Sequence, residues 1–448
     1  MSVSLVILAA GMGTRMNSDM PKVLHHVAAS PLLHHAMLAG QSLSPDRTVV
    51  VVGHGAEQVG KAAKAFDEGA VIVVQDEQKG TAHAVAQAAP LLADASGDVI
   101  ILYGDTPFIR PETLAAMHVA RKKHAIVVLG FHAADPGRYG RLIASGDTLE
   151  KIVEFKDASD AERAVTLCNS GVICADAKAL FDLVSAVEPN NAASEYYLTD
   201  IVQIARSRGL SSGIVLCPEA ETMGVNTRAQ LADAEREFQK RARAEALENG
   251  VTLTAPDTVF FAIDTVVGRD AIIGPNVVFG PGVTIESGAE IRAFCHLEGC
   301  HISRGATVGP FARLRPGAEL AEDVHVGNFV EIKNAILDEG VKVGHLTYIG
   351  DADIGEHTNI GAGTVTCNYD GVMKHRTTIG KRAFIGSDTM LVAPVKIGDG
   401  ALTASGSVIT EDVPAEAVAI ARAEQIVKAG LATKLLERLR AIKAKKGK

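Results

Sequence analysis

The sequence predicts an α/β domain joined by a helical linker to a parallel β-helix of hexapeptide repeats. Three observations lead to this fold class. Apolar runs alternate with helical patterns in the first half, a charged segment without glycine or proline follows, and an aliphatic residue then recurs at every sixth position. A chain of 448 residues also exceeds what one hydrophobic core usually serves. We therefore expect domains at residues 1–226 and 250–448, with a linker at 227–249.

The first domain is expected to contain a mainly parallel sheet. Strand-like apolar runs occupy Ser4–Ala9, Thr48–Val52, Val71–Gln75 and Asp98–Tyr103, and helical patterns such as Thr81–Leu92 separate them. Strands that alternate with helices indicate βαβ units, in which neighbouring strands run parallel. Open sheets of this kind bind ligands beyond the carboxyl ends of their strands.

The segment from Thr227 to Leu247 predicts an exposed helix. It is rich in alanine and in charged residues and contains no glycine or proline. Because it lies between two different sequence patterns, it is the expected connector between the domains.

The second domain is predicted from a period of six residues. Val267, Ile273 and Phe279 begin one register, which continues to Leu297, and a second register begins five residues later at Ile302. A helix would need a period near 3.6 and an alternating strand a period of 2, so this spacing indicates short strands separated by regular turns. Each repeat then supplies one inward-pointing side chain, and backbone groups pair between neighbouring coils.

The repeat is interrupted from Thr366 to Thr378, where the sequence reads TCNYDGVMKHRTT. Such a segment does not fit a regular wall of the β-helix and is expected to project as a loop. Excursions from a solenoid are favoured places for function.

Composition excludes several classes of protein. No run approaches the roughly 18 apolar residues that a membrane span needs. The apolar start lacks a basic segment before it, which favours a buried strand over a signal peptide. The six cysteines form no CxxC pair, and a net charge of -9 opposes nucleic-acid binding. We expect a cytoplasmic protein that binds neither membranes nor nucleic acid.

The glycine loop after the first strand, LAAGMGTRM at residues 8–16, favours a phosphate site. Gly11 and Gly13 can expose backbone N–H groups to phosphate oxygens, and Arg15 and Lys22 can offset charge that builds during phosphoryl transfer. A tight turn without a ligand is the alternative explanation of the glycines alone. The loop lacks the third glycine of a dinucleotide-binding fingerprint and the Gly-Lys-Ser/Thr of a P-loop.

Asp105 follows the strand ILY and belongs to the tripeptide YGD. At the carboxyl end of a parallel strand its carboxylate is a candidate Mg²⁺ ligand. A lone aspartate in this position is more often a turn or helix cap, so the metal hypothesis depends on the nearby glycine loop.

With these motifs the chain resembles the bacterial bifunctional N-acetylglucosamine-1-phosphate uridylyltransferase/glucosamine-1-phosphate N-acetyltransferase family over nearly its whole length. The resemblance implies a Rossmann-like nucleotidyltransferase domain and a left-handed β-helix. It assigns Mg²⁺ to Asp105 and Asn226. It implies UTP or UDP-N-acetylglucosamine contacts by Leu8, Ala9, Ala10, Gly11, Lys22, Gln75, Gly80, Thr81, Tyr103, Gly104, Asp105, Gly140, Glu154, Asn169 and Asn226.

The implied first-domain reaction is in-line attack by a phosphate oxygen of N-acetylglucosamine 1-phosphate on the α-phosphorus of UTP. Pyrophosphate leaves, and no covalent enzyme intermediate is needed. Arg15 and Lys22 are the expected catalytic cations, since catalysis here comes mostly from positioning and electrostatics.

In the second domain His345, in the motif GHLTY, is the candidate base for acetyl transfer from acetyl-CoA to glucosamine 1-phosphate. An amine that attacks a thioester must lose a proton, and histidine titrates near neutrality. A single histidine on a β-helix is more often an ordinary surface residue, and the motif separates this one from the other fourteen.

The resemblance assigns the remaining residues of that site. Glucosamine 1-phosphate would contact Arg315, Lys333, Tyr348 and Asn359, and acetyl-CoA would contact Ala362, Asn368, Tyr369, Ser387, Ser405 and Arg422. A small residue, often alanine, is typical of the family at position 405. The resemblance also implies a homotrimer whose acetyl site is shared between subunits. The basic tail after Lys434 would lie near CoA or remain a solvated helix.

Two other interpretations remain open at this stage. The β-helix could serve only assembly or regulation of a nucleotidyltransferase, or the whole protein could be a trimeric scaffold that binds a nucleotide sugar without catalysis. Lys333, His345 and the NYDG excursion together favour a second activity. Arg15 together with Asp105 favours catalysis in the first domain. The product would supply cell-wall and outer-envelope polymers.

Overall fold

The computed structural model describes residues 2–446. It divides into two compact units, one ending at Ala242 and the other beginning at Arg243. The division lies inside α8 (Arg228–Glu248), the helix predicted at 227–247. Most of α8 is exposed as expected, but Ala234 and Gln239 are buried.

The first unit contains a mixed nine-stranded sheet among its described residues. Its order is β5 (Val71–Val74), β4 (Arg47–Val52), β1 (Val3–Ala9), β6 (Asp98–Tyr103), β10 (Leu167–Asp176), β7 (Ile126–His132), β11 (Ser212–Leu216), β9 (Thr148–Val153) and β8 (Arg141–Ser145). The pairs β5–β4, β4–β1 and β1–β6 are parallel, as predicted. β10 runs antiparallel to both of its neighbours, so the sheet is mixed rather than parallel throughout.

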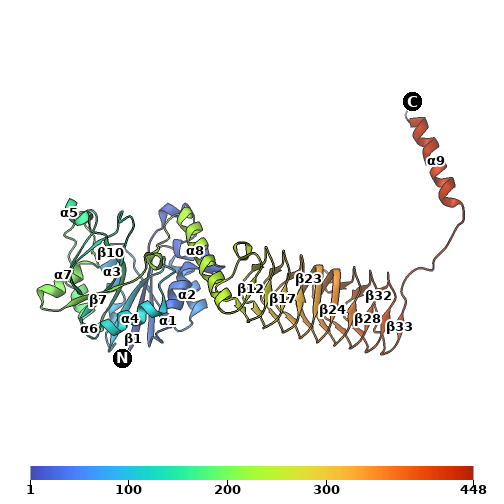
Figure 1. The fold of residues 1–448 in the computed structure, drawn as a ribbon, viewed down its shortest axis with the longest axis horizontal. Helices are drawn as coiled ribbons and strands as arrows, with labels where there is room; N and C mark the ends of the chain where they lie inside the picture. The colour runs from blue at the N-terminus through green and yellow to red at the C-terminus, as the bar shows by residue number, and fades with distance from the viewer. Residues whose placement is uncertain (1, 447–448) are drawn as a thin grey trace. The chain divides into compact units, whose positions relative to one another are not determined.

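Helices cover both faces of this sheet (Figure 1). They are α1 (Leu32–Gln41), α2 (Ala56–Phe66), α3 (Thr81–Ala86), α4 (Pro111–Ala120), α6 (Ala177–Val184) and α7 (Asp200–Ser207). A short further helix, α5 (Asp160–Arg163), has no buried residue. β1 explains the two layers, because alternate side chains point to opposite faces. Val6 and Leu8 belong to the core beneath α3, α6 and α7, whereas Leu5 and Ile7 belong to the core beneath α1, α2 and α4. Every residue of β1 is buried, as expected of a strand covered on both faces.

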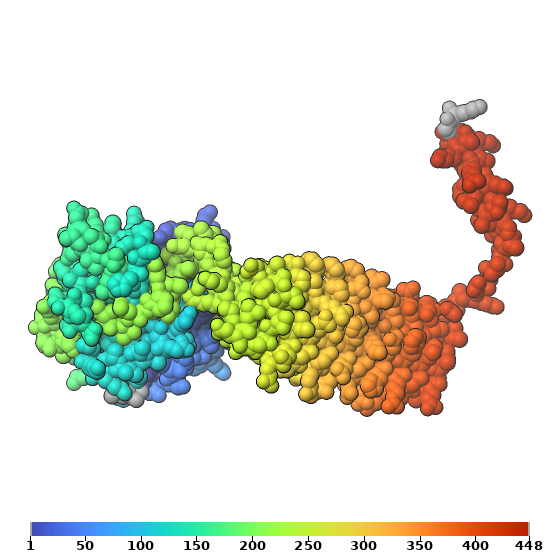
Figure 2. Space-filling model, in the orientation of Figure 1, coloured from blue at the N-terminus to red at the C-terminus, as the bar shows by residue number. Residues whose placement is uncertain are grey.

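The second unit is a parallel β-helix, whose successive coils are seen in Figure 1 and whose surface changes in colour from yellow-green to red along its length in Figure 2. Its strands are β12 (Thr252–Leu253), β13 (Val266–Val267), β14 (Ile272–Ile273), β15 (Val278–Phe279), β16 (Thr284–Ile285), β17 (Glu290–Ile291), β18 (His296–Leu297), β19 (Cys300–Ile302), β20 (Thr307–Val308), β21 (Arg313–Leu314), β22 (Ala318–Leu320), β23 (His325–Leu337), β24 (Lys342–Ile354), β25 (Asn359–Ile360), β26 (Val365–Cys367), β27 (Thr377–Ile379), β28 (Phe384–Ile385), β29 (Met390–Val392), β30 (Val395–Ile397), β31 (Leu402–Thr403), β32 (Val408–Ile409) and β33 (Val418–Ala419).

The register explains the six-residue period. β14 pairs in parallel with β17, three strands later, so three hexapeptides make one coil. Ile273 stacks on Ile291, which stacks on Val308, and all three side chains are fully buried. The coil that pairs Ile285 with Ile302 is one residue shorter, which accounts for the five-residue step in the sequence.

The predicted excursion does leave the wall, but over a shorter segment than expected. Thr366 and Thr377 are fully buried in β26 and β27. The projecting part is residues 369–376, in which Tyr369 and Val372 are exposed, whereas Asn368 is still buried. Beyond the last coil, α9 (Leu431–Lys446) has every side chain exposed. None of the helices within residues 2–446 is long and apolar enough to cross a membrane.

Candidate active sites

The first unit brings four predicted site residues into direct contact. The Lys22 Nζ atom pairs with the Asp105 carboxylate and donates to Asn226 Oδ1 at 2.9 Å. Arg15 Nη2 donates to the same amide oxygen at 3.0 Å. Arg15 belongs to the glycine loop and Lys22 to the short 3-10 turn Lys22–Leu24 that follows it. Asp105 follows β6 and Asn226 precedes α8, so the fold gathers two cations and two oxygen ligands at the carboxyl edge of the sheet.

Glycine allows the loop to approach Lys22. Gly13 has a φ of 60°, and a Cβ atom there would lie 2.6 Å from the Lys22 Cβ atom. Any other residue would therefore push Lys22 away from Asp105. Gly104, next to Asp105, donates its N–H to the Leu8 carbonyl at 2.9 Å and fixes the end of β6 against β1.

The two proposed metal ligands fit a hard divalent cation. Asp105 offers a carboxylate and Asn226 an amide oxygen, which are the ligand types that Mg²⁺ prefers. Both oxygens converge on one point, because a single ammonium group, that of Lys22, reaches both of them.

The predicted sugar contacts Gly140, Glu154 and Asn169 lie close to one another. Asn169 donates its backbone N–H to the Gly140 carbonyl at 2.9 Å. A Cβ atom on Gly140 would lie 3.3 Å from a Glu154 carboxylate oxygen. Burial raises the pKa of Glu154, although a hydrogen bond from Thr199 opposes the shift. Burial also raises the pKa of Tyr103, and the charges of Glu154 and Asp105 add to this effect.

The predicted nucleotide contacts form a third group around the glycine loop. Ala10 accepts a hydrogen bond from Gln78 Nε2 at 2.6 Å through its carbonyl, while Leu8 and Ala9 end β1 and Gly11 is exposed. Gln75 is buried and contacts the Gly80 carbonyl. Thr81 Oγ1 accepts the N–H of Leu198 at 3.0 Å, which fastens this segment to the loop before α7.

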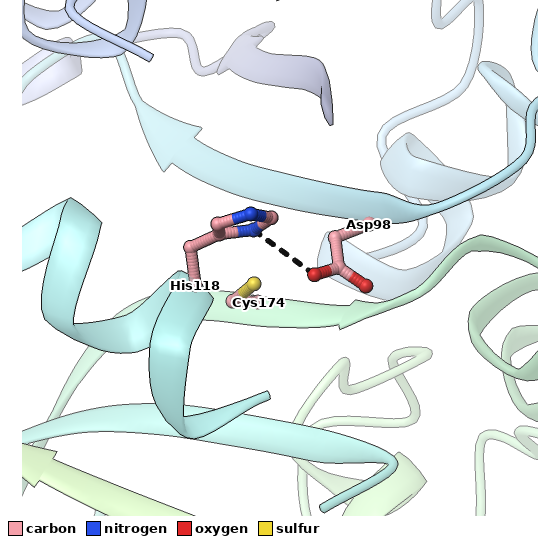
Figure 3. Close-up of side chains that lie close together, drawn as sticks. All are labelled: Asp98, His118 and Cys174. Atoms are coloured by element: carbon pink, nitrogen blue, oxygen red, sulfur yellow. Dashed lines mark ion pairs between the residues drawn. The ribbon is translucent and has the colours of Figure 1, made fainter. Parts of the chain in front are cut away.

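A separate cluster of Asp98, His118 and Cys174 lies at the opposite, amino end of β6 (Figure 3). His118 Nδ1 is 3.0 Å from one Asp98 oxygen, and Arg121 Nε is 2.6 Å from the other. Sulfur and imidazole suit zinc rather than magnesium, and Arg121 already neutralises the carboxylate. Burial raises the pKa of the Cys174 thiol, which favours its protonated form. This cluster ties α4 to the sheet and is distinct from the predicted Mg²⁺ site.

In the second unit the candidate base and two of the predicted phosphate ligands, Lys333 and Tyr348, lie on the paired strands β23 and β24. The register of β23 and β24 pairs Lys333 with Gly350, two residues from Tyr348, and pairs Asn328 with His345. His345 is exposed, and within residues 2–446 its imidazole makes no hydrogen bond. Arg315 Nη1 donates to a Glu331 carboxylate oxygen at 2.9 Å. A sugar phosphate bound by Arg315 would therefore compete with Glu331 for the guanidinium group.

The excursion supplies a second cation to this site. Lys374 lies beside Lys333, and this contact, followed by burial, lowers the pKa of Lys333. Asp351 accepts hydrogen bonds from Asn334 Nδ2 at 2.6 Å and from Asn368 Nδ2. Burial pushes the Asp351 pKa up, but these bonds and the two lysines outweigh it and leave the pKa lowered.

The other predicted acetyl-CoA and sugar residues lie on the following coils. Asn359 begins β25, and the Ala362 carbonyl accepts the N–H of Asp388, next to Ser387. Arg422 Nη1 donates to the Ser405 carbonyl at 2.8 Å, so this contact uses the backbone rather than the hydroxyl. Tyr369 is exposed on the excursion. Within one chain these residues are not gathered around His345 as tightly as the first site is around Asp105.

Sequence reasoning missed several polar neighbours of both sites. Lys374 stood inside the excursion, and its charge was the available signal. Asp351 gave no signal in the sequence, because its partner Asn334 lies on the neighbouring coil. His83 gave none either, because its contact with Gln75 depends on how the chain between these two residues folds back.

Two family models match separate parts of the chain. A family described as MobA-like NTP transferase domain matches residues 5–170. A second, described as bacterial transferase hexapeptide (six repeats), matches residues 264–299 and 376–411.

Curated relatives align along the whole chain, and each is named "Bifunctional protein GlmU". The relative from Cereibacter sphaeroides is 76% identical over 448 residues, covering 100% of this chain and 99% of its own. The relative from a Ruegeria species is 66% identical over 448 residues, covering 100% of both chains. The one from Paracoccus denitrificans is 64% identical over 438 residues, covering 98% of each.

Among solved structures, a UDP-glucose pyrophosphorylase complexed with UDP-glucose has a TM-score of 0.45 and 17% identity, covering 54% of this chain and 100% of its own. That likeness is too distant to bear on function. The full-length relatives decide the question, and the predicted family is confirmed. The chain belongs to the bifunctional GlmU family.

Proposed function

We propose that this enzyme makes UDP-N-acetylglucosamine in two steps at two separate sites. The β-helix transfers an acetyl group from acetyl-CoA to glucosamine 1-phosphate, and the first unit then transfers uridylyl from UTP to N-acetylglucosamine 1-phosphate with release of pyrophosphate. The observation that carries the uridylyl step is the convergence of Arg15 and Lys22 on the oxygens of Asp105 and Asn226. The product is a precursor of cell-wall and envelope polymers, and the reducing cytoplasm suits the six free thiols.

For uridylyl transfer the chain supplies position and charge. The N–H groups of the glycine loop would bind phosphate oxygens, and Arg15 and Lys22 would stabilise negative charge on the phosphates as the bond to pyrophosphate breaks. Glu154 and Asn169 orient the sugar, so that its phosphate oxygen lies in line with the leaving group. Mg²⁺, held by Asp105 and Asn226, would neutralise phosphate charge when bound. Lys22 must then leave the oxygens that it contacts in this structure.

For acetyl transfer His345 accepts the proton that the amine of glucosamine 1-phosphate loses as its nitrogen attacks the thioester carbon. The carbon–sulfur bond then breaks, and the leaving CoA sulfur takes this proton from His345, so that CoA departs as its thiol. Arg315 and Lys333, with Lys374 beside them, provide the positive charge that the sugar phosphate requires. Asn368 is buried and held by Asp351, which fixes it close to this pair of lysines.

A homotrimer would complete the second site. Phe294, Phe311 and Phe329 occupy the same corner of successive coils, with ring centroids 4.9 and 5.3 Å apart, and each is about half exposed, at 52%, 46% and 56%. Leu346, next to His345, is 60% exposed. This apolar ladder is costly in water and ends at the candidate base. Covering it with a second copy of the chain would desolvate His345 and supply the partner that its imidazole lacks within residues 2–446.

A coupled assay tests both steps on purified protein. With acetyl-CoA, glucosamine 1-phosphate, UTP and Mg²⁺, free CoA and pyrophosphate are measured separately, and both should appear. Pyrophosphate from N-acetylglucosamine 1-phosphate without any CoA release would leave the β-helix as a scaffold. Binding of UDP-N-acetylglucosamine without either product would indicate a non-catalytic protein.

A further inference from the structure

The amide of Gln75 is held by two hydrogen-bond acceptors. Its Nε2 atom donates to the Gly80 carbonyl at 3.2 Å and to His83 Nδ1 at 3.0 Å. The side chain is buried, with 4% of its surface exposed. A primary amide carries two hydrogens, so both donors of Gln75 are used within the protein.

These contacts fix which way the amide faces. If nitrogen and oxygen changed places, the Gln75 oxygen would lie against the Gly80 carbonyl oxygen, and two acceptors would oppose each other. The remaining polar atom of the amide is Gln75 Oε1, which accepts no hydrogen bond from any residue within 2–446. Gln75 therefore offers an acceptor, and not a donor, to a ligand.

His83 can accept from Gln75 only through an unprotonated Nδ1, since a neutral imidazole has one acceptor nitrogen. Gln87 Nε2 is also near the ring, 3.3 Å from His83 Nε2. Gln87 donates one of its two amide hydrogens to the His83 carbonyl at 3.0 Å, and because Gln87 is only partly buried, water can accept the other. The shorter contact, from Gln75 to Nδ1, is therefore the one that uses the acceptor nitrogen of the ring.

The surrounding backbone holds His83 in place. Ala82 donates to the Tyr196 carbonyl at 2.9 Å, and Tyr196 donates back to the Lys79 carbonyl at 2.8 Å. The Tyr196 ring lies 6.3 Å from the imidazole, centroid to centroid. Gly80 has a φ of 117°, and a Cβ atom there would come within 2.5 Å of the Tyr196 carbonyl oxygen. The segment from Lys79 to His83 is thus a fixed frame for Gln75.

We infer that His83 is a positioning residue that makes Gln75 select uracil over cytosine. The inference rests on the proposed function, which places Gln75 beside the base of UTP. An acceptor at that point matches the N3–H donor of uracil, whereas N3 of cytosine is itself an acceptor and would oppose it. Without the contact to His83, only the longer contact to the Gly80 carbonyl opposes rotation of the amide, which would offer its NH₂ group to cytosine.

The test compares kcat/KM for UTP and CTP with N-acetylglucosamine 1-phosphate. His83→Phe keeps a ring but removes the acceptor, and should lower the UTP-to-CTP ratio about 10-fold or more, because a mismatched buried polar group is what rejects the wrong base. His83→Asn can present an oxygen near the position of Nδ1 and should retain most of the selectivity. Gln87→Leu, which touches His83 but not Gln75, is the matched control and should keep the wild-type ratio.

The ratio separates positioning from general damage. If His83→Phe lowers kcat/KM for both nucleotides equally, His83 is only structural and the inference is wrong. If that variant is unstable, the ratio is measured on His83→Ala, with the same two outcomes. Acetyl transfer by the same sample reports whether the chain is folded. Wild-type protein that forms no pyrophosphate from UTP would instead overturn the proposed function itself.

Discussion

The two candidate sites differ in how completely one chain builds them. Around Asp105, polar groups from three distant segments already contact one another, and the metal ligands converge on a single ammonium group. Around His345, the base is exposed and has no hydrogen-bond partner within residues 2–446, and an apolar ladder leads up to it. An α/β sheet encloses its site with loops of its own chain, whereas a β-helix presents a convex wall and needs another surface to form a pocket.

The largest effect is expected from Asp105→Ala. Removing the carboxylate leaves Lys22 without its ion-pair partner and removes a proposed metal ligand, so uridylyl transfer should fall by at least about a hundredfold. Acetyl transfer should be unchanged, because this residue belongs to the other unit. Pyrophosphate and CoA release are measured on the same sample. Glu112→Ala, an exposed acid on α4, is the control, and retention of near-normal uridylyl transfer by Asp105→Ala would contradict the assignment.

The converse variant is His345→Ala. Loss of a general base usually costs about 10²–10⁴ in rate, so CoA release should fall within that range while pyrophosphate formation from N-acetylglucosamine 1-phosphate continues. His301→Ala is a matched control, since His301 is also exposed on the β-helix but pairs with Glu286. Equal acetyl transfer by the two variants would remove His345 from the site.

A smaller, selective effect is expected from Phe329→Glu. A charge in the middle of the exposed ladder should weaken self-association and lower acetyl transfer about tenfold, because burying an unpaired carboxylate is unfavourable. Uridylyl transfer should stay within twofold of wild type. Light scattering after size exclusion gives the oligomeric state. A variant with the wild-type molar mass and full acetyl transfer would show that the ladder is not an interface.

The smallest effect concerns stability at Glu154. Burial raises the pKa of Glu154 in the folded state. At a pH between the ordinary and the raised pKa, the folded state therefore keeps a proton that the unfolded state has released. By linkage, the free energy of unfolding falls as pH rises through that interval. Glu154→Gln cannot ionise and should be more stable than wild type at neutral pH, with a flatter pH profile, while its affinity for the sugar falls. Urea unfolding at pH 4 and pH 7 measures this, and a variant less stable than wild type at both would contradict it.

The same contrast explains what could be predicted from the sequence. The stacking of Ile273 on Ile291 follows directly from the six-residue period, because the repeat fixes both the coil and the inward face. Asp105 could be placed because the end of a parallel strand is recognisable. The antiparallel direction of β10 could not be predicted, since a buried apolar run has the same sequence pattern in a parallel and in an antiparallel strand.

Contacts made between distant side chains were hidden for a related reason. The proximity of Lys374 to Lys333 depends on how the excursion folds back over the coil, and the contact of His83 with Gln75 depends on the frame that Tyr196 holds. Neither arrangement leaves a periodic trace in the sequence. For the acetyl site, one chain also lacks the surface that a second copy would add.

Complementation tests the central claim, two independent sites in one chain, most directly. Asp105→Ala and His345→Ala proteins are each supplied with glucosamine 1-phosphate, acetyl-CoA, UTP and Mg²⁺, first separately and then mixed. Neither alone should form UDP-N-acetylglucosamine at an appreciable rate. The mixture should form it, because N-acetylglucosamine 1-phosphate made by the first variant is a substrate for the second. If either variant lacked both partial reactions while folded, or if the mixture stayed inactive, the two sites would not be independent.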